Sequence, residues 1–163
     1  MKLCTIACAL ALLFAAASAQ IGETPAGDPR IRAALDELDV NYEVDSDGDF
    51  KVVFEFEEDG RSQIAFINSN TETFKLFEIR ELWSPGYSSD LPFSAKVANR
   101  LLEDSFDKKL GAWQTMMNSE KRVAVFAAKI AAGADPQSLW ATLKLVLVAA
   151  DEMEKELLGT DDF

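Results

Sequence analysis

Hydrophobic residues recur at helical spacing in three segments of the chain. Each segment has a proline near its start, and in the first and third an aspartate, Asp28 or Asp135, stands in the capping position just before that proline. Such caps satisfy the backbone N–H groups that have no partner in the first turn of a helix. The predicted helices are residues 29–39, 92–108 and 136–158.

Between these helices, hydrophobic and polar residues alternate with the period of a strand. Clusters of Asp, Gly, Ser and Asn at residues 45–49, 58–61 and 118–121 predict tight turns. Residues 74–83 are ambiguous between strand and helix, but their aromatic and β-branched content favours a strand that ends at the turn Ser84-Pro85-Gly86. The predicted strands are residues 40–44, 50–56, 64–67, 74–83, 110–117 and 123–130.

The order of these elements is one helix, a run of strands, a second helix, two strands and a third helix. Such an order predicts an α+β fold with an antiparallel sheet of five to six strands and three helices packed on one face.

Composition excludes several kinds of site. The chain of 163 residues has no histidine, and its two cysteines are Cys4 and Cys8. Imidazole or thiolate zinc sites and nucleophiles activated by histidine are therefore not expected in the mature domain, and we expect no cofactor. The net charge of −12 also argues against nucleic acid as a partner.

Charge is distributed unevenly along the sequence. Residues 20–74 carry a net charge of −10, residues 75–129 carry +2 and residues 130–163 carry −5. The acid excess is typical of a solvated surface. The alternative is that the nearly neutral middle third carries a contact surface, since burying it costs less desolvation.

The first 19 residues have the pattern of a secretion signal. Lys2 precedes an apolar run of about a dozen residues, and Ala17-Ser18-Ala19 matches a signal peptidase site before Gln20. We expect cleavage there, a periplasmic or secreted product, and no stable membrane insertion afterwards. Acylation at Cys8 and an uncleaved membrane tether are the alternatives.

Two carboxylate patterns suggest specific chemistry. Asp45-x-Asp47-x-Asp49 looks like the start of a calcium loop, but its glycine is displaced and the twelfth position is Phe56, so a hairpin turn is favoured. Glu55 and Glu57 share a strand face at roughly 6.5 to 7 Å, near the separation in an inverting glycosidase. A wet strand face explains that pair better. A secreted carboxylate-dependent glycan hydrolase and a calcium-responsive module remain the alternative functions.

Aromatic and aliphatic residues of the middle third are candidates for partner binding. Aromatics surround the Pro-Gly turn, where core packing explains them less easily than in mid-strand. The alternative is that they close the end of the core. The candidate partner-binding residues, which include three from the second helix, are Trp83, Tyr87, Phe93, Val97, Leu101 and Leu102. No catalytic or metal-binding residue is assigned.

Several local stretches, together with the element order, resemble the YbjN-like family. They are Ala33-Ala34-Leu35 and residues 44–50, 66–69, 76–85, 101–104, 110–113 and 149–151. The family is described as a proposed bacterial sensory transduction regulator, and its fold is similar to that of type III secretion chaperones. The resemblance runs from about Arg30 to Leu158. With the secretion signal, it predicts a chain made of a signal peptide at residues 1–19, a linker at 20–28, a YbjN-like domain at 29–158 and an acidic tail at 159–163.

The same resemblance implies a function without enzymatic activity. We expect an exported protein-binding, chaperone-like or regulatory domain whose partner is an unidentified protein or a second copy of the chain. The second helix is the element that the resemblance to type III chaperones places near a dimer interface.

Overall fold

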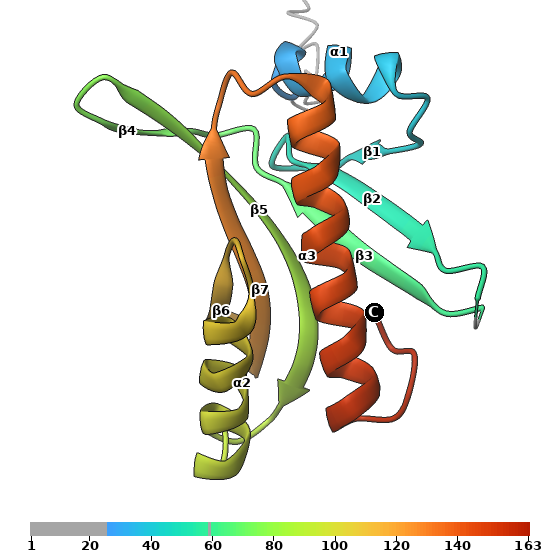
Figure 1. Cartoon of the computed structure of the whole chain (residues 1–163), viewed down its shortest axis with the longest axis vertical. Coiled ribbons are helices and arrows are strands. Elements are labelled where there is room, and N and C mark those ends of the chain that lie inside the picture. The colour runs from blue at the N-terminus through green and yellow to red at the C-terminus, as the bar shows by residue number, and fades with distance from the viewer. Residues whose placement is uncertain (1–25, 59) are drawn as a thin grey trace, which may run out of the picture.

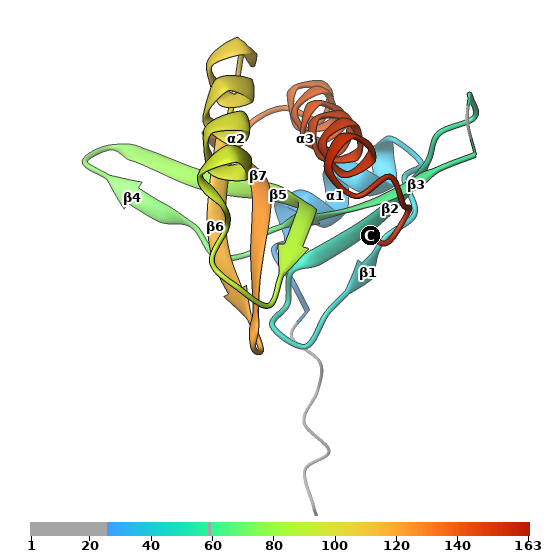
Figure 2. The ribbon, with the colours of Figure 1, turned by 90° about the horizontal axis from the view of Figure 1, so that it is seen from below.

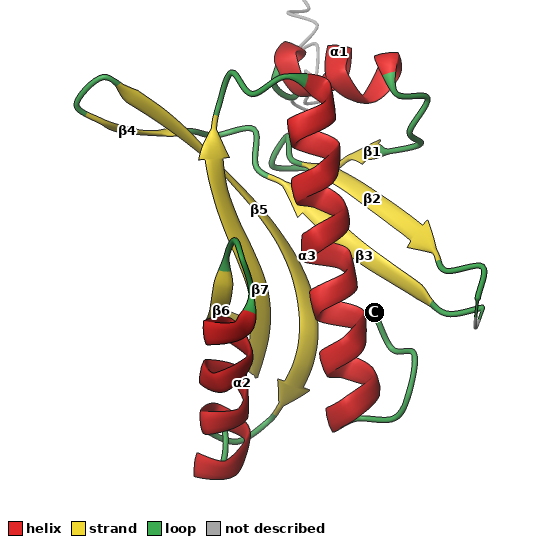
Figure 3. Ribbon diagram, viewed as in Figure 1, coloured by secondary structure: helices red, strands yellow, loops and turns green. Residues whose placement is uncertain are grey.

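The computed structural model describes residues 26–58 and 60–163, so the predicted signal peptide lies outside the described residues. The structure has three described helices and a seven-stranded antiparallel sheet, which confirms the predicted α+β fold (Figures 1 and 3). None of the described helices is long and apolar enough to cross a membrane. The elements are α1 (Pro29–Glu37), β1 (Glu43–Val44), β2 (Phe50–Glu55), β3 (Ser62–Ile67), β4 (Glu72–Phe74), β5 (Phe77–Ser89), α2 (Ala95–Asp107), β6 (Ala112–Asn118), β7 (Lys121–Ala131) and α3 (Pro136–Leu157).

The strands are ordered β1-β2-β3-β5-β7-β6, and β4 pairs with the beginning of β5. Strand β5 is therefore shared by the two halves of the sheet. On one side it joins β1, β2 and β3, and on the other side it pairs along most of its length with β7. Strand β6 forms the outer edge next to β7.

The predicted turn at residues 84–86 is wrong, because β5 continues through this segment. The pairing of β5 with β7 shifts register between Pro85 and Tyr87, which is a bulge. Bulges are among the few places where a strand tolerates proline, which has no N–H for the ladder. Three consecutive turn-forming residues therefore mark an irregularity inside a long strand.

Strands β3 and β5 pair at only two positions, Phe66 with Trp83 and Ile67 with Leu82. Beyond them, side chains replace the backbone ladder: the Ser84 hydroxyl donates to the carbonyl oxygen of Ile64 at 2.6 Å, and the Gln63 amide donates to that of Pro85 at 3.0 Å. Both side chains are fully buried. They satisfy polar groups that would otherwise be lost where the strands separate.

Helices α2 and α3 lie on the same side of the sheet (Figure 2). Helix α3 packs on β3, β5 and β7, and its residues Leu143 and Leu147 are fully buried in the core. Gly86 permits this close approach. A Cβ atom there would lie 2.6 Å from the Trp113 ring and 2.9 Å from the carbonyl oxygen of Ala150 in α3.

Two further boundaries differ from those predicted. Helix α2 begins at Ala95, because the side chain of Ser94 accepts the N–H of Val97 and caps the helix, so Pro92 lies outside it. The segment predicted as one strand from residue 74 contains a hairpin turn. Phe74 ends β4 and pairs with Phe77, which begins β5.

Candidate functional site

The six predicted partner-binding residues do not form one surface. Tyr87 and Phe93 pack edge to face, with ring centroids 5.2 Å apart, and together with Val97 they lie half-buried against the core. Leu101 is only 5% exposed and belongs to the core itself. These four residues join the end of β5 to the inner face of α2.

The other two residues lie elsewhere. Trp83 stacks on Phe66 with a centroid distance of 4.3 Å, and its indole N–H donates to Asn68 at 3.0 Å. It lies between Leu82 and Ser84, which are buried toward the core, so it occupies the opposite face of the sheet. Leu102 points away from the core and is 65% exposed.

Exposed apolar side chains gather where α2 lies along the edge strand β6. Phe106 is one helical turn after Leu102 and is 89% exposed, and both methionines of β6 are also exposed. We call Leu102, Phe106 and Met117 the α2–β6 surface, because Met117 shares the strand face of Trp113, whereas the side chain of Met116 lies on the other face of the sheet. Leu102 is one of the predicted partner-binding residues and Phe106 is not, although the spacing of four residues places the two side chains on one flank of α2.

Polar contacts fix α2 against its neighbours and leave that flank open. The indole N–H of Trp113 donates to Asp104 at 2.8 Å, and the backbone N–H of Trp113 donates to the Ser105 hydroxyl at 2.9 Å. On the side toward α3, Arg100 pairs with Glu156 at 2.7 Å, and hydrogen bonds from Arg100 lower the pKa of that carboxyl. The α2–β6 surface is thus carried by a well-anchored helix.

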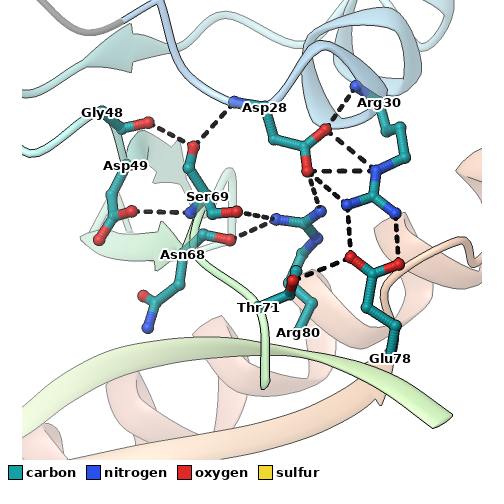
Figure 4. A network of polar contacts seen from close by, with 9 residues as sticks. All are labelled: Asp28, Arg30, Gly48, Asp49, Asn68, Ser69, Thr71, Glu78 and Arg80. Atoms are coloured by element: carbon teal, nitrogen blue, oxygen red, sulfur yellow. Dashed lines mark hydrogen bonds and ion pairs between the residues drawn. The ribbon is translucent and has the colours of Figure 1, made fainter. Parts of the chain in front are cut away.

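A dense polar network occupies the opposite end of the sheet, below α1 (Figure 4). Asp28 caps α1 and also pairs with Arg30 at 2.7 Å and Arg80 at 2.5 Å. Burial by itself would raise the pKa of Asp28, but hydrogen bonds from both arginines hold it well below its usual range. Arg30 binds Glu78 through both of its terminal nitrogens at 2.8 Å and lowers the pKa of that carboxyl to about 2.

Arg80 is the centre of this network. Its side chain is almost completely buried and donates to the carbonyl oxygens of Asn68 and Ser69, at 2.5 and 3.1 Å, as well as to Asp28. It therefore ties α1 to β5 and to the loop after β3. Figure 4 shows that loop also held by Ser69, which accepts from the Asp28 N–H and donates to the Gly48 carbonyl.

A second ionic cluster anchors the C-terminal tail. Arg61 donates to Asp151 at 2.6 Å and to Glu154 at 3.2 Å in α3, and also to the carbonyl oxygen of Thr160 at 2.7 Å. Desolvation raises the pKa of the fully buried Glu154. Oxygens of Asp151, Glu154 and Asp161 lie within 4.8 Å of one another, a spacing that could hold a metal ion, but the Arg61 guanidinium already supplies positive charge to them.

The aspartates of residues 45–49 act mainly on their own backbone. Asp45 accepts the N–H groups of Asp47 and Asp49 at 2.9 and 3.0 Å, and Gly48 takes a left-handed conformation with φ of 86°. The carboxylate of Asp49 accepts the Ser69 N–H at 2.7 Å. These contacts are those of a hairpin turn.

The two glutamates suggested for glycan hydrolysis do not share a strand. Strand β2 ends at Glu55, so the alternation that would place both carboxylates on one face stops before Glu57. Both residues are exposed, and Glu55 lies opposite Ser62 of β3. Among the described residues, every buried polar side-chain atom has a hydrogen-bond partner.

The similarity of this chain to known proteins is low. No protein-family model matches the chain, and none of the curated proteins is similar to it in sequence. Among solved structures, it is similar to the crystal structure of YbjN, a proposed transcription regulator from E. coli, with 11% identity and a TM-score of 0.40 over 77% of this chain and 88% of that one. So distant a likeness concerns the fold alone.

Proposed function

We propose that this chain is an exported, non-enzymatic protein-binding domain of regulatory or chaperone-like type, and that its α2–β6 surface binds a second copy of the chain. The observation that carries the proposal is the exposure of Leu102 and Phe106 beside β6, one edge of which has no strand partner among the described residues. Exposed apolar patches of this kind mark interaction sites, because keeping large hydrophobic side chains in water gives a monomer no benefit.

The edge strand supports self-association. Among the described residues, β6 pairs only with β7, so one row of its backbone N–H and C=O groups has no strand partner. A second β6 in antiparallel orientation would satisfy both edges at once, as a two-fold interface requires. Leu102 and Phe106 would then pack around the strand pair.

Charge supports the same surface. Residues 95–122, from the start of α2 to the β6–β7 turn, contain six basic and four acidic residues, in a chain of net charge −12. Two copies repel each other over most of their surfaces, and this repulsion is smallest where the acid excess is absent. The middle third is thus the region through which two acidic molecules can approach.

Sedimentation equilibrium of wild type and Phe106→Ser tests the proposal. We expect wild type to dimerise and Phe106→Ser to weaken the dimer by about 1 to 2 kcal/mol or more, because the variant removes an aromatic anchor. Its thermal stability should barely change, since an exposed side chain contributes little to the core. Val53→Ser is the matched control, because Val53 is also a large exposed hydrophobic residue but lies on β2.

A wild-type protein that stays monomeric at high concentration would overturn the second copy as partner. Pull-down from extract would then compare wild type with Phe106→Ser: a protein captured by wild type and lost with Phe106→Ser would identify a different partner for this surface. Equal capture by the two proteins would exclude the α2–β6 surface as the binding site.

A further inference from the structure

The β4–β5 hairpin projects from the body of the molecule and ends in apolar side chains (Figures 1 and 2). Phe74 and Phe77 are 67% and 63% exposed, and Leu76 between them is fully exposed. Together with Lys75 they form a four-residue segment that we call the hairpin tip. It lies apart from the α2–β6 surface, at the other end of the long strand β5.

The residues at the tip are energetically unfavourable in the isolated protein. Lys75 takes a left-handed conformation with φ of 56°, which two-residue hairpin turns normally assign to Asn or Gly. Leu76, the second residue of the turn, has no positive φ, so the turn does not require a particular residue there, and its side chain is not part of the core. Neither the turn geometry nor packing within the described residues accounts for three large hydrophobic side chains at this point.

Charges just below the tip are paired, whereas the charge at the tip is not. Glu78 binds Arg30 at 2.8 Å, and Glu72 lies 3.7 Å from Lys129. Among the described residues, Lys75 forms no ion pair, and its ammonium lies 5.7 Å from the Phe74 ring centroid. The distal end of the hairpin is therefore apolar with one available cation, and it projects from a body that is strongly acidic.

The size of the tip distinguishes between its candidate partners. Its three side chains offer roughly 400 Å² of apolar surface, about half of what each partner contributes to a standard protein interface. A narrow convex tip of this size suits the boundary between lipid headgroups and acyl chains, where apolar side chains insert and a lysine extends to the phosphates. A flat contact with a second copy would leave most of the tip in water.

We propose that the hairpin tip contacts a phospholipid surface, with Phe74, Leu76 and Phe77 entering the interfacial layer and Lys75 reaching a lipid phosphate. The contact is shallow and reversible, because a few inserted side chains give only weak adsorption. Projection of the hairpin keeps the acidic body away from the headgroups, and separation beyond a Debye length, about 8 to 10 Å, screens its charge. This inference does not depend on the proposed function.

Co-sedimentation with vesicles tests the inference. The probes are vesicles of phosphatidylcholine alone and of phosphatidylcholine mixed with phosphatidylglycerol. We expect wild type to bind, and Leu76→Ser combined with Phe77→Ser to lower the partition coefficient by about tenfold or more. Lys75→Ala should reduce binding less. Phe106→Ser, which alters the α2–β6 surface, should bind vesicles like wild type.

Several outcomes would overturn the inference. Failure of wild type to sediment with either kind of vesicle would contradict it, and so would binding of the double variant equal to that of wild type. If the double variant instead loses self-association and vesicle binding is absent, the tip is a protein contact. Circular dichroism checks that the double variant is folded, and Leu76→Ser alone, at a fully exposed position, provides a second variant that should leave folding intact.

Discussion

The two ends of the sheet use their side chains in opposite ways. Below α1, Arg80 is buried among a carboxylate and two carbonyl oxygens, and nearly every charge has a partner. At the other end, α2 and β6 expose Phe106 and Met117 to water, and β6 leaves one backbone edge open. The first end is closed by polar contacts within the chain, whereas the second offers apolar contacts to something else.

This contrast explains why strongly polar clusters are poor guides to function in this protein. The clusters around Arg80 and Arg61 join segments far apart in the sequence, and their hydrogen-bonding groups are used in doing so. A surface that binds a partner should instead be energetically unfavourable in the isolated monomer. Exposed hydrophobic side chains meet that criterion, both on α2 and at the hairpin tip.

The largest effect should come from breaking the polar end with Arg80→Met. The substitution removes the buried charge, leaves two carbonyl oxygens without this donor and leaves Asp28 with Arg30 as its cation. We therefore expect a loss of about 3 to 5 kcal/mol in the free energy of unfolding, measured with urea. Arg30→Met is the control. Arg30 is half exposed, and its loss should cost about 1 kcal/mol or less. Equal effects of the two substitutions would contradict the contrast between buried and exposed pairs.

Tyr87→Ala tests whether an aromatic residue at the apolar end of the sheet belongs to the core or to a binding surface. Tyr87 was a candidate for partner contact, but it packs half-buried against Phe93 and the core. We expect a stability loss of about 2 kcal/mol, less than for a fully buried aromatic, with an unchanged dimer constant. The opposite result, weaker association at constant melting temperature, would return Tyr87 to the binding surface.

The dependence of stability on pH should reflect two sets of carboxylates. Desolvation raises the pKa of Glu154 and Asp49, so the folded state takes up their protons first, and stability should increase as pH falls from neutral through these raised values. The lowered pKa values of Asp28 and Glu78 act in the opposite sense. Their contribution is complete above about pH 5 and is lost progressively as pH falls toward 2.

Melting temperatures across this range should therefore pass through a maximum in mild acid. Glu154→Gln should reduce the rise in melting temperature between neutral pH and the maximum. Glu78→Gln should reduce the fall in melting temperature at pH values below the maximum. A wild-type curve that rises steadily from pH 4 to pH 7 would show that the raised pKa values of Glu154 and Asp49 do not govern stability.

The smallest change should follow the addition or removal of calcium. Asp45 and Asp49 already accept backbone N–H groups, and Arg61 lies among the three carboxylates near α3. We expect the addition of calcium or of a chelator to change the melting temperature by less than about 2 °C, because these carboxylates already have other partners. A ligand bound only by the folded state would raise the melting temperature. An increase of several degrees would indicate an oxygen-ligand site and favour the calcium-responsive alternative.

The elements that could be predicted from the sequence are those set by local signals. Asp28 and Asp135 cap the helices that begin at the next residue, and the hairpin turn at residues 45–49 forms where Asp and Gly cluster. The misread segment around Pro85 is a strand because β5 continues to pair with β7 across a bulge, and no local pattern encodes that distant partner. Nor does sequence spacing reveal that Arg80 meets a carboxylate 52 residues away.

The predicted partner-binding residues also show that local sequence patterns do not determine which side chains are buried. Leu101 and Leu102 are adjacent and equally hydrophobic, but the rotation of α2 on β6 buries the first and exposes the second. That rotation is fixed by contacts of Asp104 and Ser105 with Trp113. Helical spacing places Leu102 and Phe106 on one flank of α2, but it does not reveal which flank of the helix faces the core.

The two-residue junction between β3 and β5 bears on how the protein opens. Because β3 and β5 are paired at so few positions, the backbone ladder couples strands β1–β3 only weakly to strands β5, β7 and β6. Helix α3 packs on both parts of the sheet and holds them together. Gly86 lets this helix approach β5 closely. A bulkier residue there would weaken the packing of α3 on β5, so that each part of the sheet could unfold locally and exchange its amide protons without the other.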